Sequence, residues 1–528
     1  MGLGEERGGP GTNLIVTSLN KIVNIRNSIM KKFYITTPIY YVNDKPHIGH
    51  AYTTIAADVI SRWRRMQEDD VYFLTGTDEN SQKNVEAAKK AGIDDIKKYL
   101  DQMSAVWQET WDSLGLSVND FIRTTETRHL KAVNKFFQLV NEKRDIYQGE
   151  YEGWYCDGCE AFVTESELDD GNCPIHKKPV KRIKEKNYFF KLTKYRQALL
   201  DHIDRHPYFI QPAARRNEVV SYIRDFMEDI SISREGIEWG IRLPIDENQV
   251  IYVWFDALIN YLSAVGFADD AKKFKKYWPA DMHLVGKDII KFHCALWPAM
   301  LMSAGLPLPK KIFAHGFFTI DGQKISKSLG NAIDPVELAG VYGLDTIRYF
   351  LLREISFGED GSFSTDRLKE RYENDLANEL GNLLNRVLSM TEKYFDGITP
   401  KAVKEDIENW PIVIESYDKL DFTRVLDESW EAIREANRFI DQEQPWKLAK
   451  IDMRRLGAVM YILLETLRQI GWMIYPIMPQ TAEEIWLQLG LDWEKEKQNK
   501  FTKAIKWGGL KAGTKIKKRG PLFPRIES

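Results

Sequence analysis

The stretch that most constrains this chain is residues 33–50, which predicts a buried strand, a turn and the start of a helix. Phe33 to Ile35 form an apolar run, and turn residues follow it: Pro38, Asn43, Asp44 and Pro46. Apolar or small side chains then recur at helical spacing from Gly49 to Trp63. A strand, a turn and a helix N-terminus in this order offer backbone N–H groups and a positive dipole end to an anion.

Two imidazoles, His47 and His50, lie at the predicted helix start. Gly49 between them leaves room for a bulky group close to the backbone. A single histidine near a helix start is usually structural, but two in this context favour a triphosphate site.

A second donor-rich stretch lies far downstream, at Lys324-Ile325-Ser326-Lys327-Ser328, between Gly322 and Gly330. Alone, it is typical of a solvated surface turn. Together with the two histidines, it predicts the second half of a clamp for a polyphosphate.

These two stretches resemble the HIGH and KMSKS signatures of class I aminoacyl-tRNA synthetases. From about Lys31 to the C-terminal end, the surrounding sequence resembles the methionyl-tRNA synthetases of that class. The resemblance implies an α/β Rossmann-like nucleotide-binding domain with a parallel sheet, a zinc-knuckle insertion in it, and a C-terminal α-helical anticodon-binding bundle. It also implies a ligase that activates L-methionine with Mg-ATP and transfers it to tRNA(Met).

Composition agrees with a large folded chain. Of 528 residues, 43% are hydrophobic and 29% charged, and the net charge of -3 leaves any nucleic-acid contact to local patches. The most apolar stretch, Met460 to Met478, is interrupted by Glu465 and Arg468, so we expect no membrane span. Three of the four cysteines are clustered, which is not a disulfide framework, and we expect a soluble cytoplasmic protein.

The resemblance and the texture of the sequence together divide the chain into seven segments. Residues 1–30 are an extension, expected to be disordered, which is either a short presequence or, as we favour, the product of an upstream start. The other segments are the Rossmann domain's first half (31–145), a connective insertion (146–250), the second half (251–315), the KMSKS loop and stem-contact region (316–370), the anticodon-binding domain (371–505) and a tail packing back on the catalytic half (506–528).

Strand and helix signals alternate through the first half. Val71 to Leu74 predict a second strand, which leads to Asp78 at the edge where ligands of parallel sheets bind. Its structural role would be helix capping. In the resembling family this carboxylate faces the substrate ammonium group, although here Asn80 stands where many relatives have histidine. The second half begins with Val250 to Leu258, which we predict to be a strand of the same sheet.

The resemblance assigns substrate contacts residue by residue. The methionine-binding residues are Ile39, Tyr41, Asp78, Trp254, Ala257, Tyr261, Ile290 and His293; the ATP-binding residues are His47, Gly49, His50, Gly286, Asp288 and Lys327; and the catalytic residues are His47, His50, Lys324 and Lys327. Aromatic neighbours suit the polarizable methionine sulfur. Rejection of leucine comes from shape, about 1–3 kcal/mol per methylene-sized difference, with a further hydrogen bond to the sulfur from Tyr261 or His293.

Cysteine spacing predicts a metal site. Cys156 and Cys159, then Cys173 and His176, form two pairs with knuckle spacing, as expected for one tetrahedral zinc ion. All four ligand positions are filled by protein, so the zinc would be structural.

From Arg371 to about Trp493 the pattern is amphipathic and helical. Asn382 and Arg386 are spaced to project from one helix face. The resemblance gives Asn382, Arg386, Pro445 and Trp446 to anticodon recognition, with Trp446 stacked on an unpaired base. The alternative is a salt bridge for Arg386 and a core position for Trp446.

We expect a monomer, because the appended tRNA-binding domain that dimerises some relatives is not seen after the basic tail. Three alternatives stay open at this point: another class I synthetase such as the cysteinyl enzyme, a catalytically silent tRNA-binding paralogue, and a small-molecule adenylyltransferase. The intact histidines and lysines oppose the second, and the helical half opposes the third.

Overall fold

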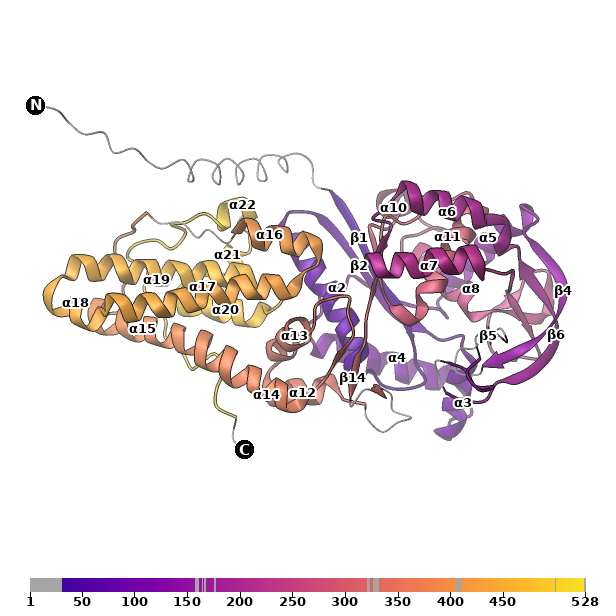
Figure 1. The fold of residues 1–528 in the computed structure, drawn as a ribbon, viewed down its shortest axis with the longest axis horizontal. Helices are drawn as coiled ribbons and strands as arrows, with labels where there is room; N and C mark the ends of the chain where they lie inside the picture. The colour runs from indigo at the N-terminus through magenta and orange to yellow at the C-terminus, as the bar shows by residue number, and fades with distance from the viewer. Residues whose placement is uncertain are drawn as a thin grey trace, which may run out of the picture.

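The computed structural model has an α/β part and an elongated helical part (Figure 1). It describes residues 31–156, 161–163, 165, 168–174, 177–320, 323–325, 332–404, 410–498 and 500–526. Within these ranges, no helix combines the length and the apolar character needed to cross a bilayer.

A six-stranded sheet forms the centre of the α/β part, and every neighbouring pair in it is parallel. Its strands, in spatial order, are β3 (Asp120–Arg123), β2 (Asp70–Asp78), β1 (Lys32–Tyr41), β12 (Met282–Gly286), β13 (Ile312–His315) and β7 (Ile210–Gln211). This confirms the predicted Rossmann-like class. The edge strand β7 comes from within the predicted insertion.

Helices cover both faces of this sheet. Consecutive side chains of β1 point to opposite sides, and on each side they are buried against helices. Ile35 joins the apolar cluster of α2 (Ile48–Met66) and α4 (Ile96–Ser113), whereas Tyr34 joins that of α5 (Thr127–Glu142) and α11 (Trp297–Ser303). Shorter helices complete the layers: α3 (Gln82–Lys90), α8 (Val253–Ala257), α9 (Asn260–Ser263) and α10 (Ala271–Tyr277).

The first strand is longer than the sequence indicates. Instead of turning at Pro38, β1 continues to Tyr41, with a shift of register between Thr36 and Ile39. Proline has no N–H to donate, so the ladder is interrupted there without ending. Its partner β2 contains Gly76. A Cβ atom at this position would lie 2.0 Å from the carbonyl oxygen of Ile122 in β3, so a side chain does not fit there.

The prediction of a sheet strand over Val250 to Leu258 is wrong. Only its first two residues, Val250 and Ile251, are in a strand: β11 (Asp246–Ile251), which belongs to a small antiparallel sheet with β9 (Ser233–Glu235) and β10 (Arg242–Leu243). Helix α8 follows. Its side chains are buried on nearly all sides, and a buried apolar run does not distinguish strand from helix.

The segment between the two sheet halves contains an antiparallel sheet of its own. It consists of β4 (Ile146–Cys156), β5 (Ala161–Val163), β6 (Lys181–Phe190) and β8 (Ile230–Ser231). The helices α6 (Arg196–Arg205) and α7 (Ala213–Asp225) follow β6 and lead the chain into and out of β7.

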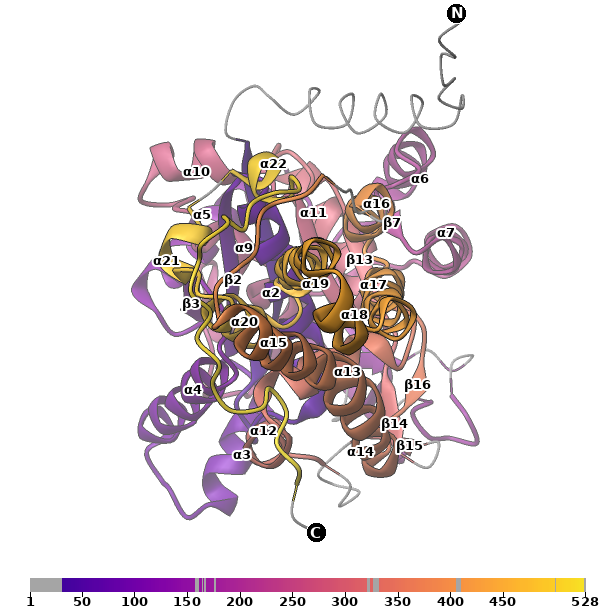
Figure 2. The ribbon, with the colours of Figure 1, turned by 90° about the vertical axis from the view of Figure 1, so that its left-hand side faces the viewer.

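A connecting region leads from the sheet to the bundle. It holds β14 (Phe318–Ile320), β15 (Gln323–Lys324), α12 (Pro335–Tyr342), α13 (Leu344–Arg353), β16 (Gly361–Ser362) and α14 (Thr365–Arg371). After a π-helical segment (Tyr372–Gly381), the helical part contains α15 (Asn382–Phe395), α16 (Trp410–Lys419), α17 (Phe422–Glu443), α18 (Pro445–Ile451), α19 (Met453–Ile474), α20 (Pro479–Gln488), α21 (Trp493–Glu496) and α22 (Phe501–Ala504). Figure 2 shows this bundle end-on.

The C-terminal tail packs differently from the expectation that it returns to the catalytic half. Among the described residues, its hydrogen bonds run to the helical part: the Lys517 N–H donates to Gln488, and the Pro524 carbonyl accepts from Tyr372. The Phe523 ring lies edge-on to that of Tyr372, 6.0 Å away. The tail therefore follows the bundle, with Leu522 and Phe523 packed against its apolar core.

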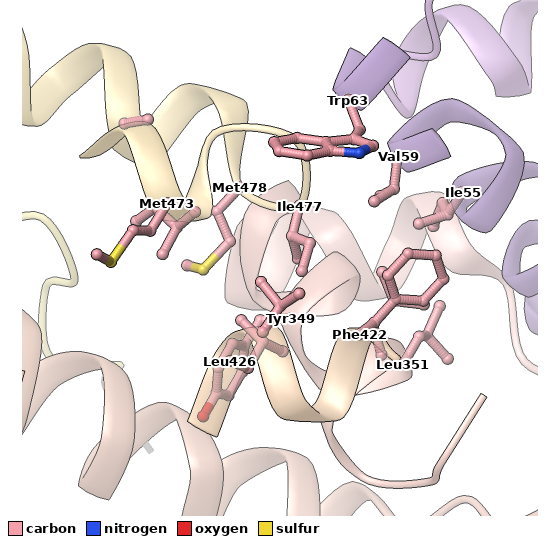
Figure 3. Close-up of a cluster of buried hydrophobic side chains, with 14 of the residues drawn as sticks. Ile55, Val59, Trp63, Tyr349, Leu351, Phe422, Leu426, Met473, Ile477 and Met478 are labelled. Carbon is pink, nitrogen blue, oxygen red and sulfur yellow. The ribbon is translucent and has the colours of Figure 1, made fainter. Parts of the chain in front are cut away.

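One apolar core joins the two parts. Figure 3 shows Ile55, Val59 and Trp63 of α2 facing side chains of α13, α17 and the loop after α19. The Trp63 ring stacks on Tyr417 of α16 with centroids 4.5 Å apart.

A buried ion pair lies in this junction. Arg348 of α13 binds Asp58 of α2 at 2.7 Å, and both side chains are 0% exposed. The same guanidinium donates to the carbonyls of Ile477 (2.7 Å) and Pro476 (3.0 Å), just before α20. Burial alone would raise the pKa of Asp58, but Arg62 and Arg348 outweigh it and hold that pKa well below its usual range.

We expect Arg348→Met to lower the free energy of unfolding by about 3 kcal/mol or more, because it leaves buried oxygens without a donor. Urea unfolding followed by circular dichroism measures this. Lys419→Met, which removes an exposed pair with Glu415, should leave the midpoint unchanged. Equal midpoints for the two variants would show that the pair contributes nothing to the junction.

Candidate active site

The two predicted histidines form a reciprocal cap at the start of α2. His47 is the N-cap, and its Nδ1 accepts the Gly49 N–H at 3.1 Å. In return, His50 Nδ1 accepts the His47 N–H at 3.2 Å. The rings lie 3.8 Å apart, so the cap holds both imidazoles side by side at a positive helix end.

This cap also fixes the tautomer of both rings. Because Nδ1 accepts a backbone N–H in each case, the proton of each neutral imidazole lies on Nε2. Both residues therefore present an N–H donor on the side away from the helix backbone. Aromatic side chains support His50: Tyr40 and Trp107 meet its ring edge-on at 5.1 and 5.0 Å.

One flank of the lysine loop lies beside this helix start. The backbone N–H of Ile48 donates to the carbonyl of Ile333 at 3.0 Å, and Ile325 is buried in the same cluster as α2. The backbone of Lys324 belongs to β15, while Lys327 lies outside the described residues. The structure therefore brings the far flank of the loop, at Ile333, to the start of α2.

Three predicted substrate-binding segments end at one edge of the sheet. Tyr41 and Asp78 are register partners at the ends of β1 and β2, and Gly286 ends β12. Asp288 follows, exposed, after Lys287, which pairs with Asp360. Because these strands are parallel, their carboxyl ends form a common edge, which we name the carboxyl edge. Asp78 does not cap α3, since Ser81 does.

The predicted methionine-binding residues from three elements meet near this edge. The rings of Trp254 and Tyr261 lie 6.3 and 5.8 Å from that of His293. Trp254 also stacks on Phe292 with centroids 4.0 Å apart. Ile39 packs against the cluster that holds Tyr261 and Ile290, and Ala257 is buried one turn from Trp254.

The histidine of this group is neutral at physiological pH. Burial lowers the pKa of His293 to about 4. Its Nδ1–H donates to the Ile289 carbonyl (3.0 Å), so Nε2 accepts the Tyr261 hydroxyl proton (2.8 Å). Both protons of the pair are thus directed to protein atoms, and a hydrogen bond to a thioether sulfur requires the Tyr261 hydroxyl to turn.

Comparison with known proteins decides the family. The family model "tRNA synthetases class I (M)" matches residues 33–182 and 166–388, and "Anticodon-binding domain of tRNA ligase" matches 412–514. Curated methionine–tRNA ligases of Caldanaerobacter subterraneus and Thermotoga maritima are 49% and 45% identical, over 94% of this chain and 79% and 81% of theirs. The chain belongs to the methionyl-tRNA synthetases.

A solved member of the methionyl-tRNA synthetases has the same fold. The Mycobacterium tuberculosis enzyme in complex with methionyl-adenylate superposes with a TM-score of 0.89 at 41% identity, over 94% of this chain and 100% of that one. Members of this family activate methionine and charge tRNA with it, and the chain is such a ligase. The cysteinyl, silent-paralogue and adenylyltransferase alternatives are therefore set aside.

Only half of the predicted zinc ligands can be located in this methionyl-tRNA synthetase. Cys156 and Cys173 are 2% and 0% exposed and share a small buried cluster with Val163. Cys159 and His176 lie outside the described residues. Among the residues that the structure describes, no three candidate ligands come together.

The predicted anticodon residues of the synthetase lie on the helical part. Asn382 is exposed at the start of α15, and Arg386 one turn later pairs with Asp441 of α17 at 2.8 Å. Pro445 is buried at the start of α18, but Trp446 is 43% exposed. The salt bridge of the alternative interpretation is thus present, whereas Trp446 is not a core residue.

Sequence reasoning missed several buried polar side chains beside the site. His283 donates from Nδ1 to Thr36 at 2.7 Å, because its Nε2 accepts the Trp297 indole N–H, and its ring lies 4.2 Å from that of Tyr261. His129 binds Asp256 at 2.6 Å. Isolated histidines in apolar helices or strands carry no sequence signal of this kind.

Gly49→Ala should lower the rate of methionine-dependent pyrophosphate exchange about tenfold or more, because a Cβ there would lie 2.9 Å from His47 Cε1 and displace the imidazole. The KM for methionine should change little. Gly340→Ala is the matched control, since nothing lies within 4 Å of its Cβ position. Exchange at the wild-type rate in the Gly49 variant would mean that the cap geometry does not matter.

Proposed function

We propose that His47, His50, Lys324 and Lys327 carry the activation of methionine by ATP at the carboxyl edge. The observation that supports this most is the bond between Ile48 and Ile333, which joins the histidine cap to the far flank of the lysine loop. A helix N-terminus with donor side chains, bonded to the flank of a lysine-rich segment, suits a triphosphate.

In the proposed first step, the methionine carboxylate attacks the α-phosphorus of ATP in line. An acyl–phosphate bond forms, the bond to the bridging oxygen breaks, and pyrophosphate leaves. The carboxylate is already a nucleophile, so positioning and charge stabilisation suffice. The Nε2–H groups of His47 and His50 donate to the phosphate oxygens, and Lys324 and Lys327 neutralise the leaving pyrophosphate together with the Mg²⁺ that ATP brings.

The same proposal gives the remaining contacts. Asp78 binds the methionine ammonium group, and the thioether lies among apolar and aromatic side chains: Ile39, Tyr41, Trp254, Ala257, Tyr261, Ile290 and His293. Gly286 and Asp288 bind the adenosine. In the second step, the terminal ribose 2′-hydroxyl of tRNA attacks the adenylate carbonyl and releases AMP.

Lys327→Ala should slow pyrophosphate exchange about 100-fold or more, since a cation on the leaving group acts mainly in the transition state. Binding of methionine, measured by titration without ATP, should be unchanged. Lys419→Ala provides a control for loss of a surface lysine. If exchange is unaffected in the Lys327 variant, the clamp assignment is wrong.

For tRNA, we propose that Asn382, Arg386, Pro445 and Trp446 read the anticodon. The half-exposed indole of Trp446 supports this, because a ring on the surface is available for stacking on a base. Arg386 and Asn382 would reach base edges, and Arg386 would then leave Asp441.

Trp446→Ala should leave pyrophosphate exchange intact and lower kcat/KM for aminoacylation about 10- to 100-fold, the equivalent of one lost stacking contact. Tyr208→Ala removes another exposed aromatic, on the segment before β7, and should change neither activity. A loss of both activities to the same degree would contradict the division of labour.

We also propose one structural zinc ion at Cys156, Cys159, Cys173 and His176. The burial of Cys156 and Cys173 in one small cluster supports it, as does the tight turn in which the Cys173 carbonyl accepts the Lys177 N–H at 2.8 Å. The ion would cross-link the end of β4 to the segment after β5 and take no part in the chemistry. Metal analysis of the purified protein should find about one zinc per chain, and Cys156→Ser should lose it. A metal-free, fully folded preparation would refute the assignment.

The cytoplasm as the location, and a monomer as the working form, stay predictions. Size-exclusion chromatography with light scattering tests the second.

A further inference from the structure

A buried carboxylate that the mechanism above does not use lies next to the methionine-binding residues. Asp256 of α8 is 0% exposed and stands between Trp254 and Ala257. Its Oδ1 lies 2.6 Å from His129 Nε2, and its Oδ2 accepts from the Asn80 side-chain amide, also at 2.6 Å. Among the described residues, no lysine or arginine forms an ion pair with it.

His129 continues this chain of hydrogen bonds into the core. A carboxylate only accepts, so the proton in the bond to Asp256 lies on the side of His129 Nε2. The other nitrogen, Nδ1, lies 3.0 Å from the Ser263 hydroxyl, and the histidine is 0% exposed. Ser263 also donates to the Ile259 carbonyl at 2.9 Å. The imidazole is thus held at both ends.

Asn80 connects Asp256 to the end of β2. Its side-chain amide binds Asp256, and its backbone N–H lies 3.2 Å from Asp78 Oδ1. The preceding backbone is also fixed, because the Glu79 N–H donates to Thr124 at 2.9 Å. One residue therefore links two buried carboxylates, of which Asp78 is 3% exposed.

We propose that Asp256 and His129 are positioning residues for methionine binding, acting through Asn80 on the carboxylate of Asp78. The proposal rests on the assignment of Asp78 to the substrate ammonium group. Asp256 fixes the Asn80 amide, the Asn80 N–H fixes Asp78 Oδ1, and His129 fixes Asp256.

We call the hydrogen-bonded series His129, Asp256 and Asn80 the relay. Because it acts on the ammonium group through Asp78, breaking it should weaken the binding of ligands that carry an ammonium group. Asp256→Asn must turn an NH₂ group toward one of its two donors, and His129→Gln loses the bond to Asp256 or to Ser263. Each variant should raise the KM for methionine in pyrophosphate exchange about tenfold, with KM for ATP and kcat per active site nearly unchanged.

Two methionine analogues sharpen the measurement. Methioninol keeps the ammonium group and lacks the carboxylate, whereas 4-(methylthio)butanoate keeps the carboxylate and lacks the ammonium group. Used as competitive inhibitors of exchange, methioninol should lose about tenfold in Ki in both variants, and 4-(methylthio)butanoate should bind as to the wild type.

Three further variants complete the set. Asn80→Ala removes the link at a partly exposed position, so it tests the relay even where the core variants fold poorly, and it should give the same pattern. Asp345→Asn makes the same change at a buried carboxylate of the interdomain junction and should leave all constants unchanged. Asp78→Asn tests the ammonium assignment itself.

The outcomes separate the two levels of inference. If Asp78→Asn leaves the Ki of methioninol unchanged, the ammonium assignment fails. If it raises that Ki while the Asp256, His129 and Asn80 variants do not, the relay is overturned and the assignment stands. Equal weakening of both analogues in the relay variants also overturns it, because that result reports general damage to the methionine-binding residues.

Discussion

The position of the helical part of this enzyme relative to the α/β part depends on the buried ion pair of Asp58 and Arg348. Helix α2 carries the histidine cap at its start and Asp58 in its middle, so the pair fastens the catalytic helix directly to α13. The same guanidinium holds the carbonyls that precede α20. Because both side chains are fully buried, the attraction is strong, and the loss of either partner would be costly.

At the start of α2, one set of hydrogen bonds serves folding and, in the proposed function, chemistry as well. The Nδ1 atoms of His47 and His50 satisfy backbone N–H groups that would otherwise lack partners at a helix start. In doing so they direct both Nε2–H groups away from the backbone. The parallel sheet adds the second element, since its strands deliver Tyr41, Asp78 and Gly286 to the same edge.

Patterns confined to short stretches made much of this predictable from sequence: the parallel sheet, the strand–turn–helix at 33–50 and the helical second half. Pairings between distant residues were not, since Asp58 and Arg348 are 290 positions apart and neither stands in a motif. Helix α8 was mistaken for a strand because burial on all sides removes periodicity. The hydrogen bonds of His129 and Asp256 were not predicted either, because isolated polar residues in buried apolar segments carry no sequence signal. The path of the C-terminal tail depends on apolar contacts, which its basic composition does not indicate.

Trp446 lies in α18, at the end of the bundle farthest from the sheet (Figure 1). The junction between this bundle and α2 is packed with aromatic rings and holds the buried pair of Asp58 and Arg348. Close packing of this kind opposes hinge bending, so it keeps the distance between α18 and the start of α2 nearly constant. If Trp446 reads the anticodon as proposed, a tRNA is selected by its length as well as by its bases, because one shorter by a helical turn could not reach both sites.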